Sequence, residues 1–153
     1  MKILVMSDSH GNKNNMLDAV DIESPDWILH LGDNDRDCTD IELIYPEIPL
    51  RSIRGNGDYF SANLDIDEFV LGDKRFFMSH GHLFGVKTGK TRITEAAINR
   101  GADILLFGHT HVQYQSNIDN MLVLNPGSIG YGRKSYAVLE IKDGVISCEL
   151  KHL

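Results

Sequence analysis

The sequence predicts one α/β domain that spans residues 1–153. Its length is that of a typical single domain, and 42% of its residues are apolar, which is enough to build a hydrophobic core. Short apolar runs alternate with polar segments along the chain, as in proteins in which strands and helices alternate. The chain contains no internal repeat, low-complexity tract or linker, so nothing in it suggests a second domain.

The first half is predicted to form three strands and two helices. The helix over residues 12–22 is indicated by Met16, Ala19 and Val20, which fall at helical spacing and would face the core. Ser24-Pro25 should end it, because proline cannot continue a helix. The other predicted elements are buried strands over residues 2–6, 26–31 and 50–54 and a short helix over residues 38–44.

The second half is predicted to be mostly strands. Residues 69–71 and 75–78 flank Gly72-Asp73, a pair typical of a two-residue hairpin turn. From residue 112 onwards the pattern indicates strands that are joined by turns, and we expect this half to form an antiparallel sheet that packs against the first half. The remaining predictions are a helix over 91–100 that ends near Gly101, a buried strand over 103–107 and turns at 119–120 and 143–144.

Composition narrows the class of protein. Lys and Arg number 15 and Asp and Glu number 22, so the net charge is −7 and broad electrostatic binding to nucleic acid is disfavoured. Cys38 and Cys148 stand in no metal-binding or redox motif, which favours two reduced thiols and a cytoplasmic location. The apolar run at residues 1–6 is too short for a signal peptide, and no stretch approaches a membrane span.

The strongest functional signal lies directly after five of the predicted strands. Each apolar run ends in a loop that combines Gly or Ser with Asp, Asn or His. In α/β sheets, ligands bind beyond the carboxyl ends of the strands, so adjacent strands would bring these loops to one patch. The five loops are Ser7-Asp8-Ser9-His10, Gly32-Asp33-Asn34, Gly55-Asn56-Gly57-Asp58, Ser79-His80-Gly81-His82 and Gly108-His109-Thr110-His111.

These loops supply oxygen and nitrogen donors but no thiolate, which argues against a structural zinc site of the cysteine type. Carboxylates combined with imidazoles suit Mn, Fe, Zn, Ni or Co. Seven donors exceed what one ion needs if it keeps a position open, whereas two ions that share a carboxylate use them all. Asp8 and His10 stand two residues apart, as do His109 and His111. On an extended segment such residues point to the same side, so we expect each pair to reach the site together. The candidate ligands are Asp8, His10, Asp33, Asn56, His80, His109 and His111.

In this order the five blocks resemble the calcineurin-like metallophosphoesterase superfamily, and Asn125-Pro126-Gly127-Ser128 adds to the likeness over residues 3–135. The short chain is similar to its small bacterial and archaeal phosphodiesterase branch, which is related to the vacuolar-sorting subunit of retromer. The resemblance implies two packed mixed β-sheets flanked by helices, in four α/β/β/α layers. It also implies one ion bound by Asp8, His10, Asp33 and His111 and a second bound by Asp33, Asn56, His80 and His109, with Asp33 bridging. Manganese is the first expectation, with Ni, Zn, Fe, Co and Mg as alternatives.

The catalytic residues that this resemblance implies are incomplete. Many members carry a histidine directly after the Gly-Asn pair, which protonates the leaving group, whereas Gly57 and Asp58 stand there in this chain. Asn56 is expected to stabilise phosphoryl charge. His82 could lie over the phosphate as an acid or donor, or could orient His80, and Asp58 could take part in the chemistry, hold a ligand histidine or cap a loop.

The resulting hypothesis is a dinuclear phosphodiesterase in which a hydroxide that bridges the ions attacks phosphorus. The alternatives are a phosphomonoesterase or nuclease, or a scaffold on the same fold without catalysis. The expected substrate is a small phosphodiester or nucleotide-like molecule, with no membrane partner. Arg133-Lys134 could contact an anion or be solvated, and the exposed aromatics permit a homodimer or a higher homo-oligomer without requiring one.

Overall fold

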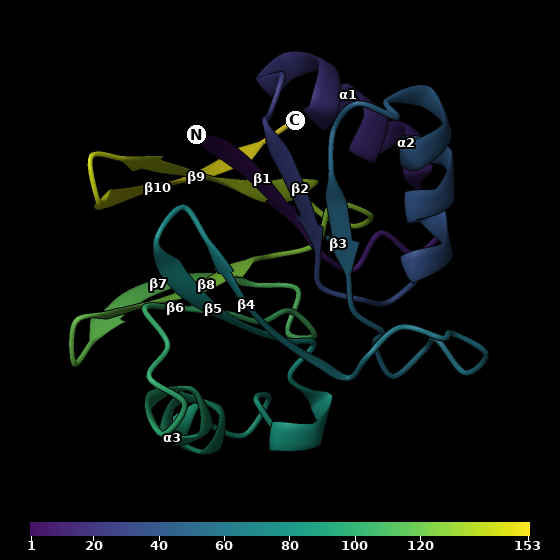
Figure 1. Ribbon diagram of the computed structural model, residues 1–153. Coiled ribbons are helices and arrows are strands. Elements are labelled where there is room, and N and C mark those ends of the chain that lie inside the picture. The colour runs from purple at the N-terminus through teal and green to yellow at the C-terminus, as the bar shows by residue number, and fades with distance from the viewer.

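Two five-stranded β-sheets packed face to face form the centre of the molecule, in a computed structural model that describes residues 1–153 (Figure 1). Two short 3-10 turns, Asp35–Asp37 and His82–Phe84, complete the regular structure. The helices and strands are β1 Lys2–Met6, α1 Lys13–Glu23, β2 Trp27–His30, α2 Cys38–Ile44, β3 Leu50–Ser52, β4 Ile66–Leu71, β5 Lys74–Ser79, α3 Thr91–Ile98, β6 Ile104–Leu106, β7 Gln113–Ile118, β8 Met121–Pro126, β9 Ser135–Lys142 and β10 Val145–His152.

Both sheets are mixed, with three parallel strands in each. Sheet A has the order β10-β9-β1-β2-β3, in which β1, β2 and β3 are parallel and β9 and β10 are antiparallel to their neighbours β1 and β9. Sheet B has the order β4-β5-β6-β8-β7, in which β5, β6 and β8 are parallel and the edge strands β4 and β7 are antiparallel. Parallel strands end at a common edge, so each sheet presents several loops at one end of the sandwich.

Alternation along the central strands builds the core on both faces of each sheet. In β1, Ile3 and Val5 belong to the cluster between the two sheets, whereas Leu4 and Met6 belong to the cluster beneath the helices. The same period of two divides β6, β5 and β2 between inner and outer clusters. Strands that are apolar on both faces are typical of parallel strands covered on both sides.

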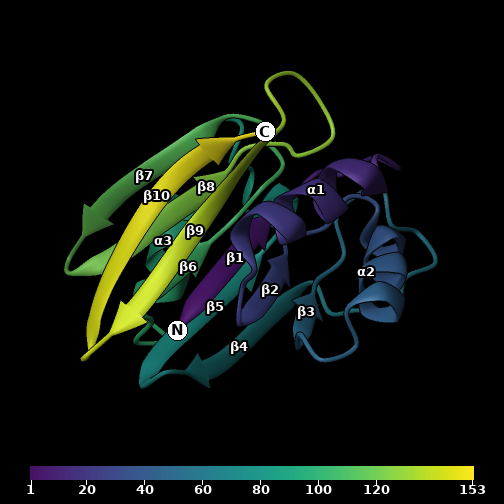
Figure 2. The same ribbon diagram turned by 90° about the horizontal axis from the view of Figure 1, so that it is seen from above.

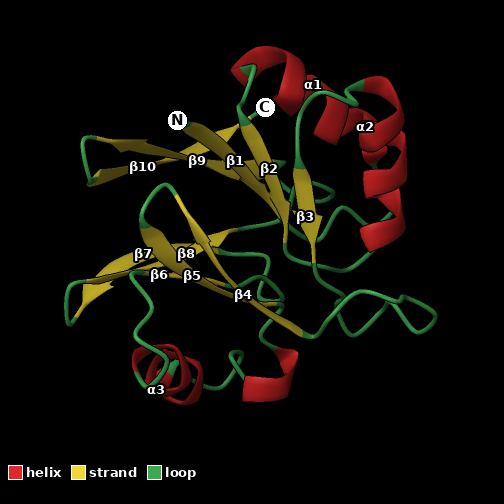
Figure 3. Cartoon of the chain, viewed as in Figure 1, coloured by secondary structure: helices red, strands yellow, loops and turns green.

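The helices cover the outer faces, which gives four layers (Figure 3). Helices α1 and α2 pack on the β1–β3 part of sheet A, and α3 packs on sheet B (Figures 1 and 2). Met16, Ala19 and Val20 of α1 are buried as their spacing predicted, and Ser24 ends this helix in a left-handed conformation. None of the helices combines the length and apolar character that a bilayer crossing requires.

The predicted four-layer α/β fold with two mixed sheets is confirmed, and most element boundaries lie within two residues of those expected. The expectation that the second half forms its own antiparallel sheet is wrong in two ways. Strands β9 and β10 leave sheet B and join sheet A, where β9 pairs with β1 through Ile3 and Leu139. Strands β5, β6 and β8 are parallel, because β6 and β8 are buried on both faces and need a covered position in the middle of a sheet.

Candidate metal centre

The loops after β1, β2, β5 and β6 meet at one end of the sandwich. Backbone hydrogen bonds join them in pairs, from the Asp8 N–H to the Gly32 carbonyl at 2.9 Å and from the Gly108 N–H to the His80 carbonyl at 3.1 Å. Gly108 faces the Ser7 hydroxyl so closely that a Cβ atom at this position would collide with it. The glycine therefore allows the loops of the two sheets to approach each other.

A first cluster of donor atoms comes from both sheets. Its four residues present one donor atom each, all within 4.8 Å of one another. His111 Nε2 lies 3.1 Å from Asp8 Oδ1 and 3.3 Å from His10 Nε2. The cluster consists of Asp8, His10, Asp33 and His111, the set that the resemblance implied for the first ion.

A second cluster shares Asp33 with the first and adds His80 and His109. His80 Nε2 lies 3.5 Å from Asp33 Oδ2 and 3.2 Å from His109 Nδ1. Asn56, the fourth ligand expected for the second ion, is exposed on the loop after β3 and lines a cavity with His82. The structure thus brings six of the seven predicted ligands into two adjoining groups with Asp33 common to both.

The donor spacing matches what a bound metal ion requires. Two nitrogens that bind one ion at about 2.1 Å, at an angle near 100°, lie about 3.2 Å apart. The pairs His10–His111 and His80–His109 have ring nitrogens 3.3 and 3.2 Å apart. Asp8 Oδ1 is buried and accepts no well-aligned hydrogen bond, although its Oδ2 accepts two, from the Ser7 hydroxyl and from the His109 N–H. A buried carboxylate oxygen left free in this way is suited to a cation.

Backbone groups orient two of these side chains. The Nδ1–H of His80 donates a 2.7 Å hydrogen bond to the Leu31 carbonyl at the end of β2. This bond orients the ring so that Nε2 points toward Asp33, which is the usual arrangement of a metal-binding histidine. Asp33 Oδ1 accepts a 2.9 Å hydrogen bond from the Gly57 N–H. Leu31 and Gly57 take part only through the backbone, so residue types gave no sign of their roles.

The backbone at the clusters differs from the expected extended conformation. Asp8, His10, His109 and His111 all have φ between 47° and 67°, in the left-handed region, and they lie beyond the ends of β1 and β6. Each pair converges through two left-handed residues and not through the alternation of a strand. This conformation is unfavourable for residues other than glycine, and such strain is concentrated at functional sites.

Electrostatics prepare Asp33 and His109 for metal binding, whereas hydrogen bonds to Asp33 and Asp8 outweigh burial and raise the pKa of His80 and His111, so a metal ion would displace a proton from those two rings. Burial alone would raise the pKa of Asp33, but hydrogen bonds from His80 and the Gly57 N–H and the positive charge of His80 lower it far below its ordinary value. Burial, followed by the positive charges of His80 and Lys87, lowers the pKa of His109 to about 4. At neutral pH the Asp33 carboxylate is therefore ionised and the His109 ring is neutral.

Asp58 does not face the donor clusters, so its predicted direct role in catalysis finds no support in this geometry. One carboxylate oxygen accepts hydrogen bonds from the N–H groups of Asp33 and Gly55 at 2.9 and 2.8 Å. The other accepts from the N–H groups of Asn34 and Asp35 at 2.8 and 3.3 Å. Both carboxylate oxygens of Asp58 therefore accept hydrogen bonds from the backbone and connect the loop of Asp33 to the loop of Asn56. This role corresponds to the loop-capping alternative.

His82 lies beside the second cluster without belonging to it. Its ring centroid is 5.5 Å from that of His80 and 6.2 Å from that of His109. Its Nδ1 is buried and has no hydrogen-bond partner. Burial and the charge of His80 lower the pKa of His82, so its ring is neutral at neutral pH. It shares a cavity of about 290 Å³ with Asn56 and with the ion pair of Arg54 and Asp65.

Tyr131 is a neighbour of the centre that sequence patterns did not indicate. Its ring centroid lies 4.9 Å from that of His10 and 6.2 Å from that of His111. The loop that carries it is held to the centre by the Ser128 hydroxyl, which donates to the Asp8 carbonyl at 2.8 Å, and by the Gly130 N–H, which donates to the same carbonyl at 3.2 Å. The Asn-Pro-Gly-Ser motif that precedes Tyr131 was the only sequence signal for this loop.

Comparison with known proteins places these features in a family. The model of the calcineurin-like phosphoesterase superfamily domain matches residues 1–144. The chain is 29% identical over 150 residues to the probable metallophosphoesterase YsnB of Bacillus subtilis, covering 94% of this chain and 86% of that protein. It is 30% identical over 145 residues to the phosphodiesterase MJ0936 of Methanocaldococcus jannaschii, covering 83% of each.

Solved structures show the same architecture. A predicted phosphoesterase from Streptococcus pneumoniae superposes with a TM-score of 0.81 at 28% identity, over 99% of this chain and 88% of that one. Vps29 of Entamoeba histolytica, in a complex with Zn²⁺, superposes with a TM-score of 0.76 at 21% identity, over 99% of each chain. At that identity the second likeness concerns the fold alone.

Proposed function

The chain belongs to the calcineurin-like phosphoesterase superfamily, and from this premise we propose that it hydrolyses phosphodiesters with two divalent metal ions. The observation that carries the proposal is the pair of adjoining donor clusters with Asp33 common to both. Relatives named as phosphodiesterases, among them MJ0936, support this reaction class. When bound, the two ions supply an activated water and neutralise charge on the phosphoryl group, with manganese our first expectation.

Some of these side chains would bind the metal ions, and others would contact the substrate. We assign Asp8, His10, Asp33 and His111 to one ion and Asp33, His80 and His109 to the other. Asn56, on the neighbouring loop after β3, is our proposed fourth ligand of the second ion. The Asn56 amide would also donate to a phosphoryl oxygen as negative charge develops there. His82, a neutral imidazole next to the second cluster, would donate a hydrogen bond to the departing alcohol oxygen and so stabilise the charge that develops there, while the proton itself comes from water.

Space on both sides of the centre supports a diester over a monoester. His111 of the first cluster lines a cavity of about 380 Å³, and Asn56 lines the separate cavity of about 290 Å³ that also contains His82. A phosphodiester carries two ester arms, and one cavity is available for each. A phosphomonoester would fill only one of them. We place the departing arm on the Asn56 side, because the hydrogen-bond donor His82 lies there.

The free thiols of Cys38 and Cys148 favour the reducing cytoplasm. The net charge of −7 disfavours nucleic acid as the substrate, so we propose a small phosphodiester or nucleotide-like molecule and no membrane partner. Exposed apolar residues such as Phe60 and Leu64 permit self-association into a homodimer or higher homo-oligomer.

The test is hydrolysis of bis(p-nitrophenyl) phosphate by protein reconstituted with Mn²⁺, with metal content measured on the same sample. We expect about two ions per chain and turnover that depends on them. Asp33→Ala and His109→Ala should each abolish turnover, whereas Asp119→Asn, at an exposed turn, should match the unchanged protein. Undiminished turnover in Asp33→Ala would refute the scheme.

The alternatives give different outcomes in the same assay. Faster hydrolysis of p-nitrophenyl phosphate than of the diester would indicate a phosphomonoesterase, and cleavage of single-stranded DNA would indicate a nuclease. A chain that binds both ions but hydrolyses no member of this panel would act as a scaffold.

A further inference from the structure

The cavity beside His111 differs in charge from the cavity beside Asn56. It contains no carboxylate, although the chain has 22 acidic residues, and one guanidinium and two imidazoles contribute to its wall. The Asn56 cavity has Arg54 neutralised by a 2.6 Å ion pair with Asp65 and also contains Asp58. The two sides of the metal centre therefore offer different environments to the two arms of a substrate.

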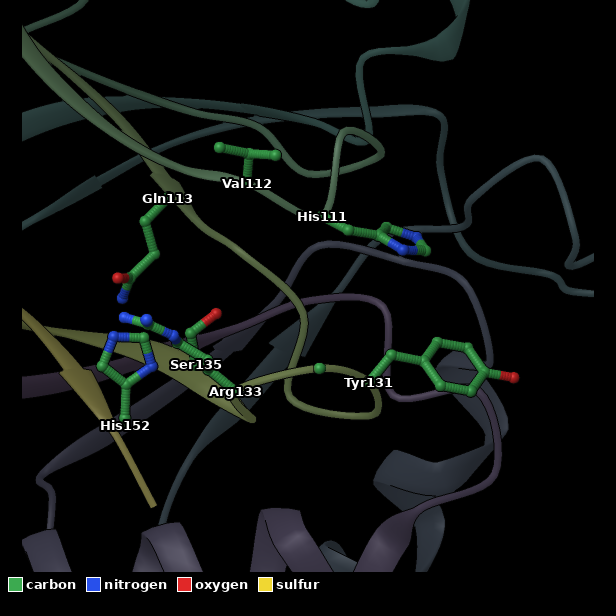
Figure 4. A pocket seen from close by; sticks show the side chains of 8 residues that line it. His111, Val112, Gln113, Tyr131, Arg133, Ser135 and His152 are labelled. Atoms are coloured by element: carbon green, nitrogen blue, oxygen red, sulfur yellow. The ribbon is translucent and has the colours of Figure 1, made fainter.

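Arg133 provides the permanent charge of the His111 cavity. Its side chain forms no ion pair and donates no hydrogen bond to the protein, unlike Arg51, Arg54 and Arg100, each of which contacts a carboxylate. Figure 4 shows the Arg133 side chain directed toward the His152 ring and the Gln113 amide, at the end of the cavity away from His111. An unpaired guanidinium presents several N–H donors in the planar arrangement that suits phosphate.

The cavity borders the proposed reaction centre at His111, which lines its wall and whose Nε2 lies 3.1 Å from Asp8. The Tyr131 ring stands at the same end, next to His111 and 55% exposed, so one of its faces is available to a ligand (Figure 4). A volume of about 380 Å³ lies within the range of roughly 300–1,000 Å³ that small-molecule sites occupy. This is room for a substituent such as a sugar phosphate.

We propose that the His111 cavity is a subsite for the retained arm of the substrate and that this arm carries a second phosphate group, bound by Arg133. The proposal rests on the proposed phosphodiesterase function and adds to it the class of substrate. The scissile phosphorus would lie at the metal centre, the second phosphate at Arg133, and the departing alcohol on the Asn56 side. In an acidic chain, this local charge selects substrates with two anionic groups over those with one.

Two chromogenic diesters that differ by one phosphate test this assignment. They are thymidine 3′-(4-nitrophenyl phosphate) and the same compound with a 5′-phosphate, assayed with Mn²⁺-loaded protein. We expect the 5′-phosphate to raise kcat/KM by about tenfold, as is typical for a hydrogen-bonded charged group. Arg133→Gln should reduce this ratio to near one. Arg92→Gln, which removes an exposed arginine on α3 that forms no ion pair, should preserve it.

Binding provides a readout that does not need turnover. Calorimetry should show that Mn²⁺-loaded protein binds thymidine 3′,5′-bisphosphate about tenfold more tightly than thymidine 3′-phosphate, and that Arg133→Gln removes the difference. Equal affinities in the unchanged protein, or equal losses in Arg133→Gln and Arg92→Gln, would overturn the subsite. Hydrolysis of neither diester would instead count against the proposed function, and the binding comparison would still decide the subsite.

Discussion

The ring of His80 donates a hydrogen bond to the carbonyl of Leu31, and this contact joins the end of β5 in sheet B to the end of β2 in sheet A. It places a buried imidazole nitrogen 3.5 Å from Asp33, which follows the same strand as Leu31. The position of a proposed ligand in one sheet is thus set by the backbone of the other.

His80→Gln should remove one of the two ions and leave the first largely in place. The change deletes the Nε2 donor of the second cluster, while Asp8, His10 and His111 keep their positions. Metal analysis after reconstitution with Mn²⁺ should find about one ion per chain. His152→Gln, an exposed substitution outside both clusters, serves as the control and should retain two. Two ions in His80→Gln would contradict the assignment.

Asp58→Asn should destabilise the protein by about 2 kcal/mol, because an amide cannot accept all the backbone hydrogen bonds that the carboxylate accepts at both oxygens. Metal affinity should fall with it, since these bonds hold the loop of Asp33. Denaturant unfolding measures the first effect and metal titration the second. Asp73→Asn, at an exposed turn, makes the same chemical change and should alter neither quantity.

Glu23 should make stability sensitive to acid. Its buried carboxylate accepts hydrogen bonds from Tyr136 at 2.9 Å and Lys151 at 2.8 Å. Burial opposes ionisation, but Lys151 and Tyr136 outweigh it and lower the pKa of Glu23 below its ordinary value. A lowered folded pKa means that the carboxylate stabilises the fold above about pH 5, and that this contribution is lost as the pH falls through the folded pKa.

Glu23→Gln should therefore cost about 2 kcal/mol at pH 7 and progressively less in acid. Unfolding of both proteins in urea at several pH values between 7 and 3 measures the difference. Glu95→Gln, on the exposed side of α3, should follow the unchanged protein at every pH. A difference for Glu23→Gln that stayed constant with pH would show that the lost contact is not ionic.

Ser24→Gly should stabilise the protein. Ser24 ends α1 with φ 45° and precedes Pro25, a backbone conformation that costs free energy for any residue with a Cβ atom. Glycine adopts it freely, and the relief should exceed its greater flexibility in the unfolded chain by about 0.5 kcal/mol. Thermal unfolding should show a higher Tm for Ser24→Gly and no gain for Ser24→Ala, which keeps the Cβ.

Much of the candidate site could be predicted because its residues belong to short motifs at strand ends. Asp8, Asp33 and His109 each follow an apolar run, and the geometry of parallel strands brings such positions together without any knowledge of side-chain packing. The roles of Asp58 and Tyr131 could not be predicted in this way. Asp58 acts on backbone N–H groups that have no sequence signature, and Tyr131 reaches the centre on a loop from the other end of the chain.

Sequence patterns also could not predict which of the two sheets each strand joins. The residues of β9 suit either sheet, because alternation specifies which face of a strand is apolar and not which neighbour it pairs with. The pairing of Ile3 with Leu139 depends on a contact across most of the chain. Left-handed backbone at His109 and His111 was likewise not predicted, since a positive φ is uncommon for every residue other than glycine.

Sheet B is made entirely from the continuous segment 66–126, whereas sheet A is assembled from segments on either side of it. That segment contributes three imidazoles to the centre, and the flanking segments contribute both carboxylates, Asp8 and Asp33. A fragment of residues 66–126 would therefore offer only uncharged donors, and the flanking pieces alone would lack His80, His109 and His111. Metal binding therefore requires that the two parts of the polypeptide pack together. The metal content of a sample then measures correct folding of the chain as well as occupancy of the metal sites.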